Sequence, residues 1–281
     1  MIFSNFHTHC FYCDGHESPE NFVKEALRLG FDAIGFSSHA PLPHPNDWTM
    51  KSTQVPEYCE TINDLKNLYK GRIEIYLGLE TDYIPDKIGP DSPEYEKLGL
   101  DYTIGSVHQV LNNKTGEYLS VDGSLKEFQM LLDDVFNGDI SRFTAHYYHL
   151  IRQMLTAHKP DIIGHLDLIK KHNRDEKYFS ETEEWYRLEI DKTLEAIANS
   201  GLFLEVNTGG ISRKYINTPY PSPWIIKRCS DFGIPIVLNS DAHSPSFLNT
   251  YFVESIEILK GAGYRSIKTM KGGKWIDRQI G

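Results

Sequence analysis

The sequence has little cysteine, no long hydrophobic run and no excess of positive charge. Four cysteines in 281 residues are too few for a disulfide scaffold, so we expect a reducing, cytoplasmic location. No apolar stretch approaches the roughly 20 residues of a membrane span, and the first residues lack the basic and apolar blocks of a signal peptide. The formal net charge of −10 argues against a nucleic-acid binder, since such proteins are usually basic. We therefore expect neither a membrane nor a nucleic-acid partner.

The chain also lacks repeats, low-complexity segments and flexible linkers, so we expect a single domain over residues 1–281. Short apolar runs alternate with helical patterns, which is typical of parallel βαβ units. We predict strands at 2–6, 33–36, 73–79, 102–107, 162–164, 202–206 and 234–238, and helices at 19–29, 55–68, 124–136, 142–157, 183–200, 223–232 and 252–262. This pattern favours an α/β barrel related to the (β/α)₈ type, with an open doubly wound sheet as the alternative. The dinucleotide signature G-x-G-x-x-G does not follow the first strand.

Nearly every predicted strand ends in a histidine or a carboxylate. In a parallel barrel the carboxyl ends of the strands meet on one face, where active sites are built. A single histidine at a strand end is more often a hydrogen-bonded loop residue than a ligand, but seven consecutive strands with such groups favour a multinuclear metal site. Imidazole and carboxylate ligands suit Zn, Mn and Fe. The residues are His7, His9, His39, Glu80, His108, His165, Glu205, Asn207, Asp241 and His243.

The order of these motifs resembles the polymerase and histidinol phosphatase (PHP) superfamily. The matching motifs are His7-Thr8-His9, Asp14-Gly15, Ser38-His39, Glu80, His108, Gly164-His165 and Asp241-Ala242-His243, which together cover most of the chain. Within the superfamily, three segments look like the histidinol-phosphate phosphatases of histidine biosynthesis. These segments are Ser38–Pro41, Gly164–Lys170 and Glu205–Thr208.

The resemblance implies a distorted (β/α)₇ TIM-like barrel that holds three divalent metal ions, of Zn, Mn or Fe. The first metal would be held by His7, His9, Glu80 and Asp241, the second by the bridging Glu80 with His108 and His165, and the third by Asp14, His39 and His243. Asp14 and His16 stand two residues apart, so either could bind the third metal. We favour Asp14 because it precedes Gly15, as the residue of the family often does.

The resemblance also implies the reaction, which is metal-dependent hydrolysis of L-histidinol phosphate to L-histidinol and phosphate. Metal ions would neutralise the phosphate and activate water, so no protein nucleophile is needed. Asp241 or His243 could act as the general acid or the general base, and the sequence does not assign which residue plays which role. One alternative is a PHP-type phosphoesterase for another monoester, such as a phosphotyrosine, a sugar phosphate or a nucleotide. The other alternative is a scaffold protein without enzymatic activity, in which we would expect some ligand positions to hold residues that cannot bind metal.

Three cationic or ionisable residues in loops of the presumed active face are candidates for substrate binding. Arg213 follows the sixth strand and could clamp the phosphate, since guanidinium geometry suits that role. His44 and Lys170 are weaker candidates. The insertion 111–160 is rich in aromatic residues and could form a lid or a wall for an imidazole ring, or simply complete the helical shell.

Overall fold

Seven parallel strands form the centre of the protein. The structure, a computed structural model, describes residues 4–281, so the predicted strand at 2–6 lies partly outside the described residues. The strands occur in the order β1 (Ser4–Asn5), β2 (Ala33–Phe36), β3 (Glu74–Asp82), β4 (Tyr102–Ser106), β7 (Ile162–Ile163), β8 (Phe203–Asn207) and β9 (Ile236–Asn239). Every neighbouring pair in this sheet is parallel. All seven strands correspond to predicted ones, with ends displaced by up to three residues.

The sheet nearly closes into a barrel just beyond the ends of β1 and β9. Thr8 and Ala242 form a parallel bridge there. The amide of His9 donates to the carbonyl of Ala242 at 2.9 Å, and the amide of Ala242 donates to the carbonyl of His7 at 3.1 Å. The predicted seven-stranded barrel is therefore confirmed, and the open-sheet alternative is wrong.

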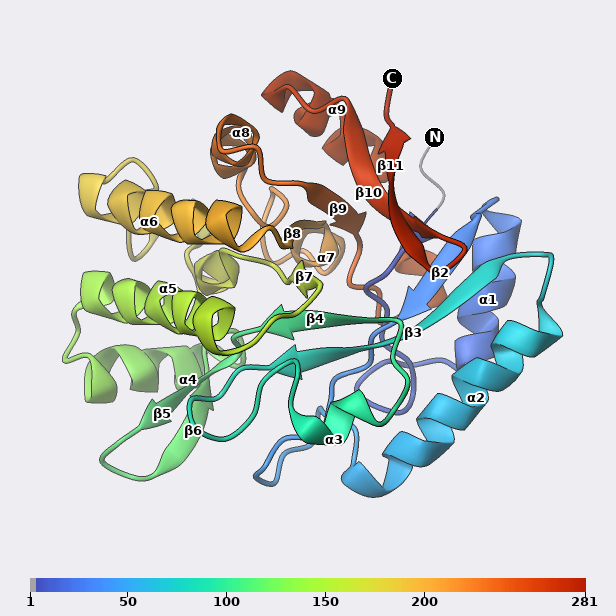
Figure 1. The fold of residues 1–281 in the computed structure, drawn as a ribbon. Coiled ribbons are helices and arrows are strands. Elements are labelled where there is room, and N and C mark those ends of the chain that lie inside the picture. The colour runs from blue at the N-terminus through green and yellow to red at the C-terminus, as the bar shows by residue number, and fades with distance from the viewer. Residues whose placement is uncertain (1–3) are drawn as a thin grey trace.

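Helices surround the barrel, and α1 and α2 lie on the opposite side from α5 and α6 (Figure 1). Local signals explain several helix starts: Ser18 accepts a hydrogen bond from the amide of Asn21 and Pro19 begins α1. The predicted helix at 124–136 is α-helical in its first part alone and then continues as a π-helical segment, Leu131–Val135. The helices are α1 (Pro19–Arg28), α2 (Val55–Leu68), α3 (Pro93–Glu96), α4 (Leu125–Met130), α5 (Ile140–Ala157), α6 (Glu184–Ser200), α7 (Gly209–Ser212), α8 (Pro223–Asp231) and α9 (Phe252–Ala262).

A C-terminal hairpin that the sequence analysis missed closes the bottom of the barrel. It consists of β10 (Ser266–Lys271) and β11 (Lys274–Gln279), joined by two glycines with positive φ. Trp275 packs against Phe6 and Phe203 inside the barrel, with ring centroids 5.3 and 5.1 Å apart. The Gly-Gly pair between alternating residues is a signal for such a hairpin. The hairpin thus covers the amino ends of the strands, opposite the ends that carry the candidate ligands.

The insertion after β4 contains a β-hairpin that the sequence did not predict, ahead of its two predicted helices. The hairpin comprises β5 (Gln109–Asn112) and β6 (Glu117–Ser120), and α4 and α5 follow it (Figure 1). Most of the aromatic residues that suggested an imidazole-binding wall are buried in the hydrophobic core, among them Phe128, Tyr147 and Tyr148. The insertion still contributes part of the wall of the active face, through Ser120, Asp122, Gly123 and Glu127.

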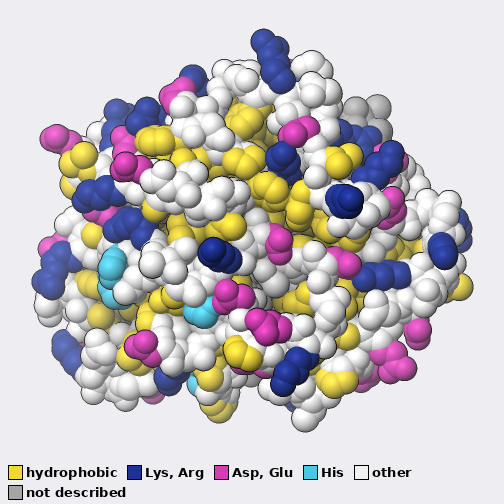
Figure 2. Space-filling view, in the orientation of Figure 1, with side chains coloured by type: hydrophobic (Ala, Val, Ile, Leu, Met, Phe, Trp, Pro, Cys, Tyr) yellow, Lys and Arg dark blue, Asp and Glu magenta, His cyan; other side chains and the backbone are white. Residues whose placement is uncertain are grey.

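The surface carries charges of both signs, which are interspersed over the face seen in Figure 2. The net charge of −10 is thus not concentrated in one block on this face. Among residues 4–281, no helix combines the length and the apolar character that crossing a lipid bilayer requires.

Candidate metal centre

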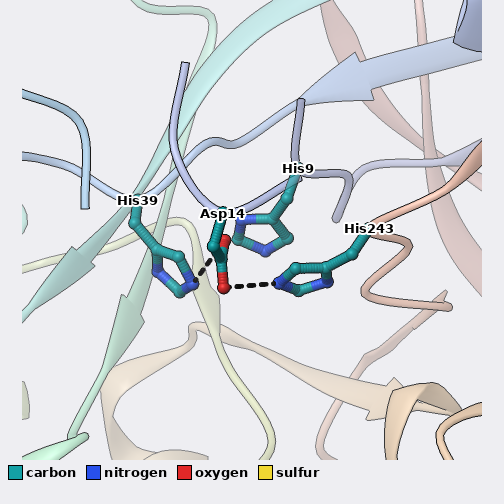
Figure 3. A group of neighbouring side chains, drawn as sticks. All are labelled: His9, Asp14, His39 and His243. Atoms are coloured by element: carbon teal, nitrogen blue, oxygen red, sulfur yellow. Dashed lines mark hydrogen bonds and ion pairs between the residues drawn. The ribbon is translucent and has the colours of Figure 1, made fainter. Parts of the chain in front are cut away.

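The nine residues predicted as metal ligands all converge at the carboxyl end of the barrel. They fall into four overlapping groups, and within each group the candidate ligand atoms lie within 4.8 Å of one another. The groups are His9, Asp14, His39 and His243; His7, Glu80 and His165; His7, His9 and Asp241; and His39, Glu80 and His108. Figure 3 shows how three loops bring the first group together.

Strand geometry explains how these side chains reach one point. His7 and His9 are two residues apart on an extended segment, so both point to the same side. Asp241, at the end of β9, has a left-handed backbone with φ of 50°, a conformation uncommon outside glycine. Such backbone strain is typical of functional sites.

Glu80 lies at the centre of the cluster of candidate ligands. Its Oε1 lies 2.9 Å from Nε2 of His165, and its Oε2 lies 3.1 Å from Nε2 of His7 and 3.0 Å from Nδ1 of His39. The side chain is only 1% exposed. One carboxylate thus faces histidines of several groups from its two oxygens, as a bridging ligand does.

Asp14 takes the position that the sequence left open between Asp14 and His16. Its Oδ2 lies 3.2 Å from Nε2 of His243, and its Oδ1 lies 3.8 Å from Nε2 of His39 (Figure 3). His16 is exposed and belongs to none of the four groups found within residues 4–281.

The donor set passes a simple test for metal binding. Five buried atoms of the candidate ligands make no hydrogen bond within the described residues, although some of them lie within ion-pair distance of one another: Nε2 of His7, Nε2 of His9, Oδ1 of Asp14, Nδ1 of His39 and Oε2 of Glu80. Burying a polar atom without a partner is costly, and buried charges are normally paired or coordinate metals. Imidazole nitrogens and carboxylate oxygens aimed at shared points are a suitable donor set for divalent transition metals.

Electrostatics keep the carboxylates ionised despite burial. Burial opposes ionisation of Glu80, but His7, His39 and His108 hold its pKa well below the ordinary value. Burial likewise opposes ionisation of Asp241, and Arg213 together with His7 lowers its pKa. Burial and the neighbouring His39 and His243 lower the pKa of His9 to about 3, so this imidazole stays neutral. Ionised carboxylates and a neutral imidazole are the forms that bind metal.

Two further carboxylates contact the histidines: Glu205, which the sequence marks as a strand-end residue without a ligand role, and Asp82, which no sequence motif singles out. Oε1 of Glu205 accepts a hydrogen bond from Nδ1 of His7 at 2.7 Å, and its Oε2 accepts from the amide of His165 at 3.0 Å. Asp82 pairs in the same way with Nδ1 of His108 at 2.7 Å. Each contact fixes the imidazole so that Nε2 points into the cluster, as outer carboxylates do in metal sites.

We expect Glu205→Gln to weaken metal binding about 10- to 100-fold, the usual range for loss of such an orienting partner. An amide can still donate to or accept from its neighbours, but it no longer favours a His7 ring protonated at Nδ1. Metal affinity measured by competition with a chelator checks this. The exposed Glu94→Gln is the matched control and should leave affinity unchanged, and equal affinities of the two variants would contradict the orienting role.

A cavity of about 560 Å³ lies directly above the cluster. It is lined by seven of the nine candidate ligands and by residues of four loops, which include Asp47, Trp48, Ser120, Asp122, Glu127, Lys171, Arg213 and Tyr215. Trp48 contacts two candidate ligands edge-on, with ring centroids 4.7 Å from His39 and 5.6 Å from His108. The cavity therefore combines metal ligands with cationic, anionic and aromatic groups.

Of the three predicted substrate-binding residues, the structure places only Arg213 at this cavity. Lys170 is 4% exposed, and its Nζ is held by Asp167 at 2.8 Å and by Ser222 at 2.6 Å. His44 stacks on Tyr118, with ring centroids 4.8 Å apart. The expected contact of Lys170 and His44 with substrate is thus corrected, because packing directs both side chains elsewhere. Lys171, the neighbour of Lys170, lines the cavity instead.

Arg213 joins the cavity to the candidate ligands. Its Nη2 donates to Oδ2 of Asp241 at 2.8 Å, and its Nη1 lies 2.9 Å from Nδ1 of His243. Oδ1 of Asp241 faces His9 at 3.2 Å, so the two oxygens of this carboxylate point in different directions. The guanidinium is consequently held in place at the edge of the cluster.

Comparison with known proteins places these observations in a family. The family model for the PHP domain matches residues 5–209. A protein of Deinococcus radiodurans named "Probable histidinol-phosphatase" is 32% identical over 269 residues, which cover 93% of this chain and 94% of that protein. The histidinol-phosphatase of Bacillus subtilis is 30% identical over 252 residues, which cover 84% of this chain and 92% of that protein.

A solved structure shows the same fold. The histidinol phosphate phosphatase of Lactococcus lactis, crystallised with zinc, L-histidinol and phosphate, superposes with a TM-score of 0.68. The alignment covers 97% of this chain and 98% of that one, at 21% sequence identity. At this identity the likeness establishes the barrel architecture.

Proposed function

Because this chain belongs to the PHP domain family, and to the histidinol-phosphatases within it, we propose that it hydrolyses L-histidinol phosphate to L-histidinol and phosphate. It is a metal-dependent phosphoric monoester hydrolase of histidine biosynthesis. The observation that carries this proposal is the convergence of nine histidines and carboxylates beneath a cavity of about 560 Å³. Relatives that bear the same activity in their names match nearly the whole chain.

The centre is proposed to hold three divalent ions of Zn, Mn or Fe. His7, His9, Glu80 and Asp241 would hold the first, Glu80, His108 and His165 the second, and Asp14, His39 and His243 the third. The overlap of the four groups at Glu80 and at His9 supports a compact multinuclear site. Bound divalent ions would neutralise the phosphate dianion and lower the pKa of water that attacks phosphorus.

Residues of the chain would bind the phosphate ester and transfer protons to or from it. Arg213 provides a fixed guanidinium that can donate to phosphate oxygens while it holds Asp241. Asp241 and His243 are the proposed proton-handling groups, because both lie at the cavity and at the ligand cluster. The leaving alkoxide of histidinol needs one proton, and either group is placed to relay it.

Substrate preference tests the proposal. The measurement is kcat/KM of the metal-loaded enzyme on L-histidinol phosphate, phosphotyrosine, a sugar phosphate and a nucleotide. We expect histidinol phosphate to exceed the others by at least about tenfold, since one charge-assisted contact contributes roughly 1.5–3 kcal/mol. A higher value on any other monoester would instead favour the broader PHP phosphoesterase alternative.

We expect Arg213→Ala to lower kcat/KM about 10- to 150-fold, because a charge-assisted hydrogen bond is worth roughly 1.5–3 kcal/mol. Arg213→Lys should recover only part of this loss, since a point charge cannot reproduce the two-pronged guanidinium. Oδ1 of Asp241 still faces His9 in both variants, so metal content should stay close to that of the wild type. Wild-type efficiency of the alanine variant would show that Arg213 does not bind the phosphate.

A further inference from the structure

One carboxylate in the cavity wall has no role in the metal centre. Asp122 lies in the loop between β6 and α4 and lines the cavity together with Ser120 and Lys171. Two other carboxylates outside the four groups of candidate ligands line the same cavity. Glu127 is part of the capping box of α4, where its Oε2 accepts hydrogen bonds from the amide and the hydroxyl of Ser124. Asp47 is exposed on its loop, whereas Asp122 is partly buried and pairs with Lys171, a cation of the cavity wall.

The carboxylate of Asp122 is held in place but keeps accepting capacity. Its Oδ1 accepts a hydrogen bond from the hydroxyl of Ser120 at 3.0 Å, and its Oδ2 accepts from Nζ of Lys171 at 3.2 Å. Lys171 is itself positioned over the ring of Tyr215, 4.5 Å from the centroid. An ionised carboxylate offers about four lone-pair sites, so each oxygen can accept a further hydrogen bond.

Asp122 is anionic and close to the second group of ligands. Burial opposes its ionisation, but the ammonium of Lys171, 3.2 Å from Oδ2, favours the charged carboxylate and holds the pKa of Asp122 below its ordinary value. The carboxylate shares the cavity with Arg213 and with the histidines that would hold a metal.

The groups that would bind a phosphate dianion disfavour an ammonium group on the same molecule. Arg213 and Lys171 line the cavity, and they would attract the phosphate but repel the ammonium, as bound divalent ions would. In a 2-aminoalkyl phosphate the ammonium is only two carbons from the ester oxygen, so it must lie near these cations when the phosphate binds. A buried ammonium needs a partner of opposite charge.

We propose that Asp122 binds the ammonium group of the substrate and so selects 2-aminoalkyl phosphates over monoesters that lack an amine. Ser120 and Lys171 hold the carboxylate in position. This inference rests on the proposed histidinol-phosphatase function and adds the residue that determines specificity within it.

The test compares two esters that differ only in the amine, L-histidinol phosphate and 3-(imidazol-4-yl)propyl phosphate. The wild type should favour the amino ester, and Asp122→Asn should reduce the ratio of the two kcat/KM values about 10- to 150-fold, the loss expected for a charge-assisted hydrogen bond. The amide is close in size to the carboxylate, and turnover of the deamino ester reports whether the variant is folded. The matched control is the exposed Asp134→Asn, which should leave the ratio unchanged.

Two results would overturn the inference and leave the proposed function intact. A ratio that Asp122→Asn does not change, whether or not both efficiencies fall, would show that Asp122 does not recognise the amine. Equal wild-type efficiency on the two esters would show the same without any variant. If the wild type hydrolysed other monoesters but not L-histidinol phosphate, the proposed function would fail together with the inference.

Discussion

Removal of the divalent ions is expected to abolish hydrolysis of L-histidinol phosphate. Nine candidate metal ligands line or underlie the cavity. In the proposed mechanism the ions that they hold would supply both charge neutralisation and activated water. Chelation followed by gel filtration should leave no measurable turnover, and Zn, Mn or Fe should restore it.

Loss of the ions should also lower thermal stability, because a ligand that binds only the folded state stabilises it. The melting temperature of the chelated protein should accordingly fall and should recover with the metal that restores turnover. A control with a metal-saturated chelator separates metal loss from an effect of the chelator itself. Full activity of a protein shown to be metal-free by elemental analysis would contradict the proposed mechanism.

Replacement of Glu80 by alanine is expected to lower kcat/KM by at least about a thousandfold, which corresponds to roughly 4 kcal/mol of transition-state stabilisation. The two oxygens of Glu80 lie within 3.1 Å of His7, His39 and His165, so no neighbouring carboxylate can replace this bridge. Metal content and turnover should fall together. Elemental analysis and kcat/KM on L-histidinol phosphate provide the two measurements.

A histidine remote from the centre provides the control for this variant. His149 is exposed on α5, so His149→Ala should retain metal and activity. His172 would be less suitable, because its ring contacts the carbonyl of Gly123 in the cavity wall at 3.1 Å. Comparable losses in the Glu80 and His149 variants would mean that turnover does not depend on the strand-end cluster.

Features that depend on local pattern were predictable from the sequence. The helix predicted at 55–68 has those same bounds as α2, and Ser18 and Pro19 begin α1 as expected. Eight of the nine candidate ligands could be found because each follows a short apolar strand, and parallel strands of a barrel end on one face. Asp14 came instead from the resemblance to the PHP superfamily. Neither inference needs knowledge of which distant segments touch.

Features that depend on distant contacts were not predictable. Lys170 and Lys171 are adjacent in a 3₁₀ segment, Leu168–His172, and nothing in their spacing shows which one reaches the cavity. Packing decides, because Ser222 binds the first lysine and Asp122 binds the second, each about 50 residues away in sequence. The hairpin that closes the bottom of the barrel was missed for a similar reason, since Trp275 finds its apolar partners in β8 and next to β1.

The sequence by itself determined the barrel, the set of candidate ligands and the class of reaction. These conclusions rest on the alternation of strands and helices, on the residues that end the strands and on the order of the motifs, all of which can be read along the chain without knowledge of its folding. Only the tertiary structure decided which candidate ligands face one another and which other groups surround them. Glu205 orients His7 from 198 residues away, and Asp122 enters the cavity because Lys171 and Ser120 hold it there. Hydrogen bonds and ion pairs act over a few ångströms, so they become visible only once the chain has folded and brought distant residues together.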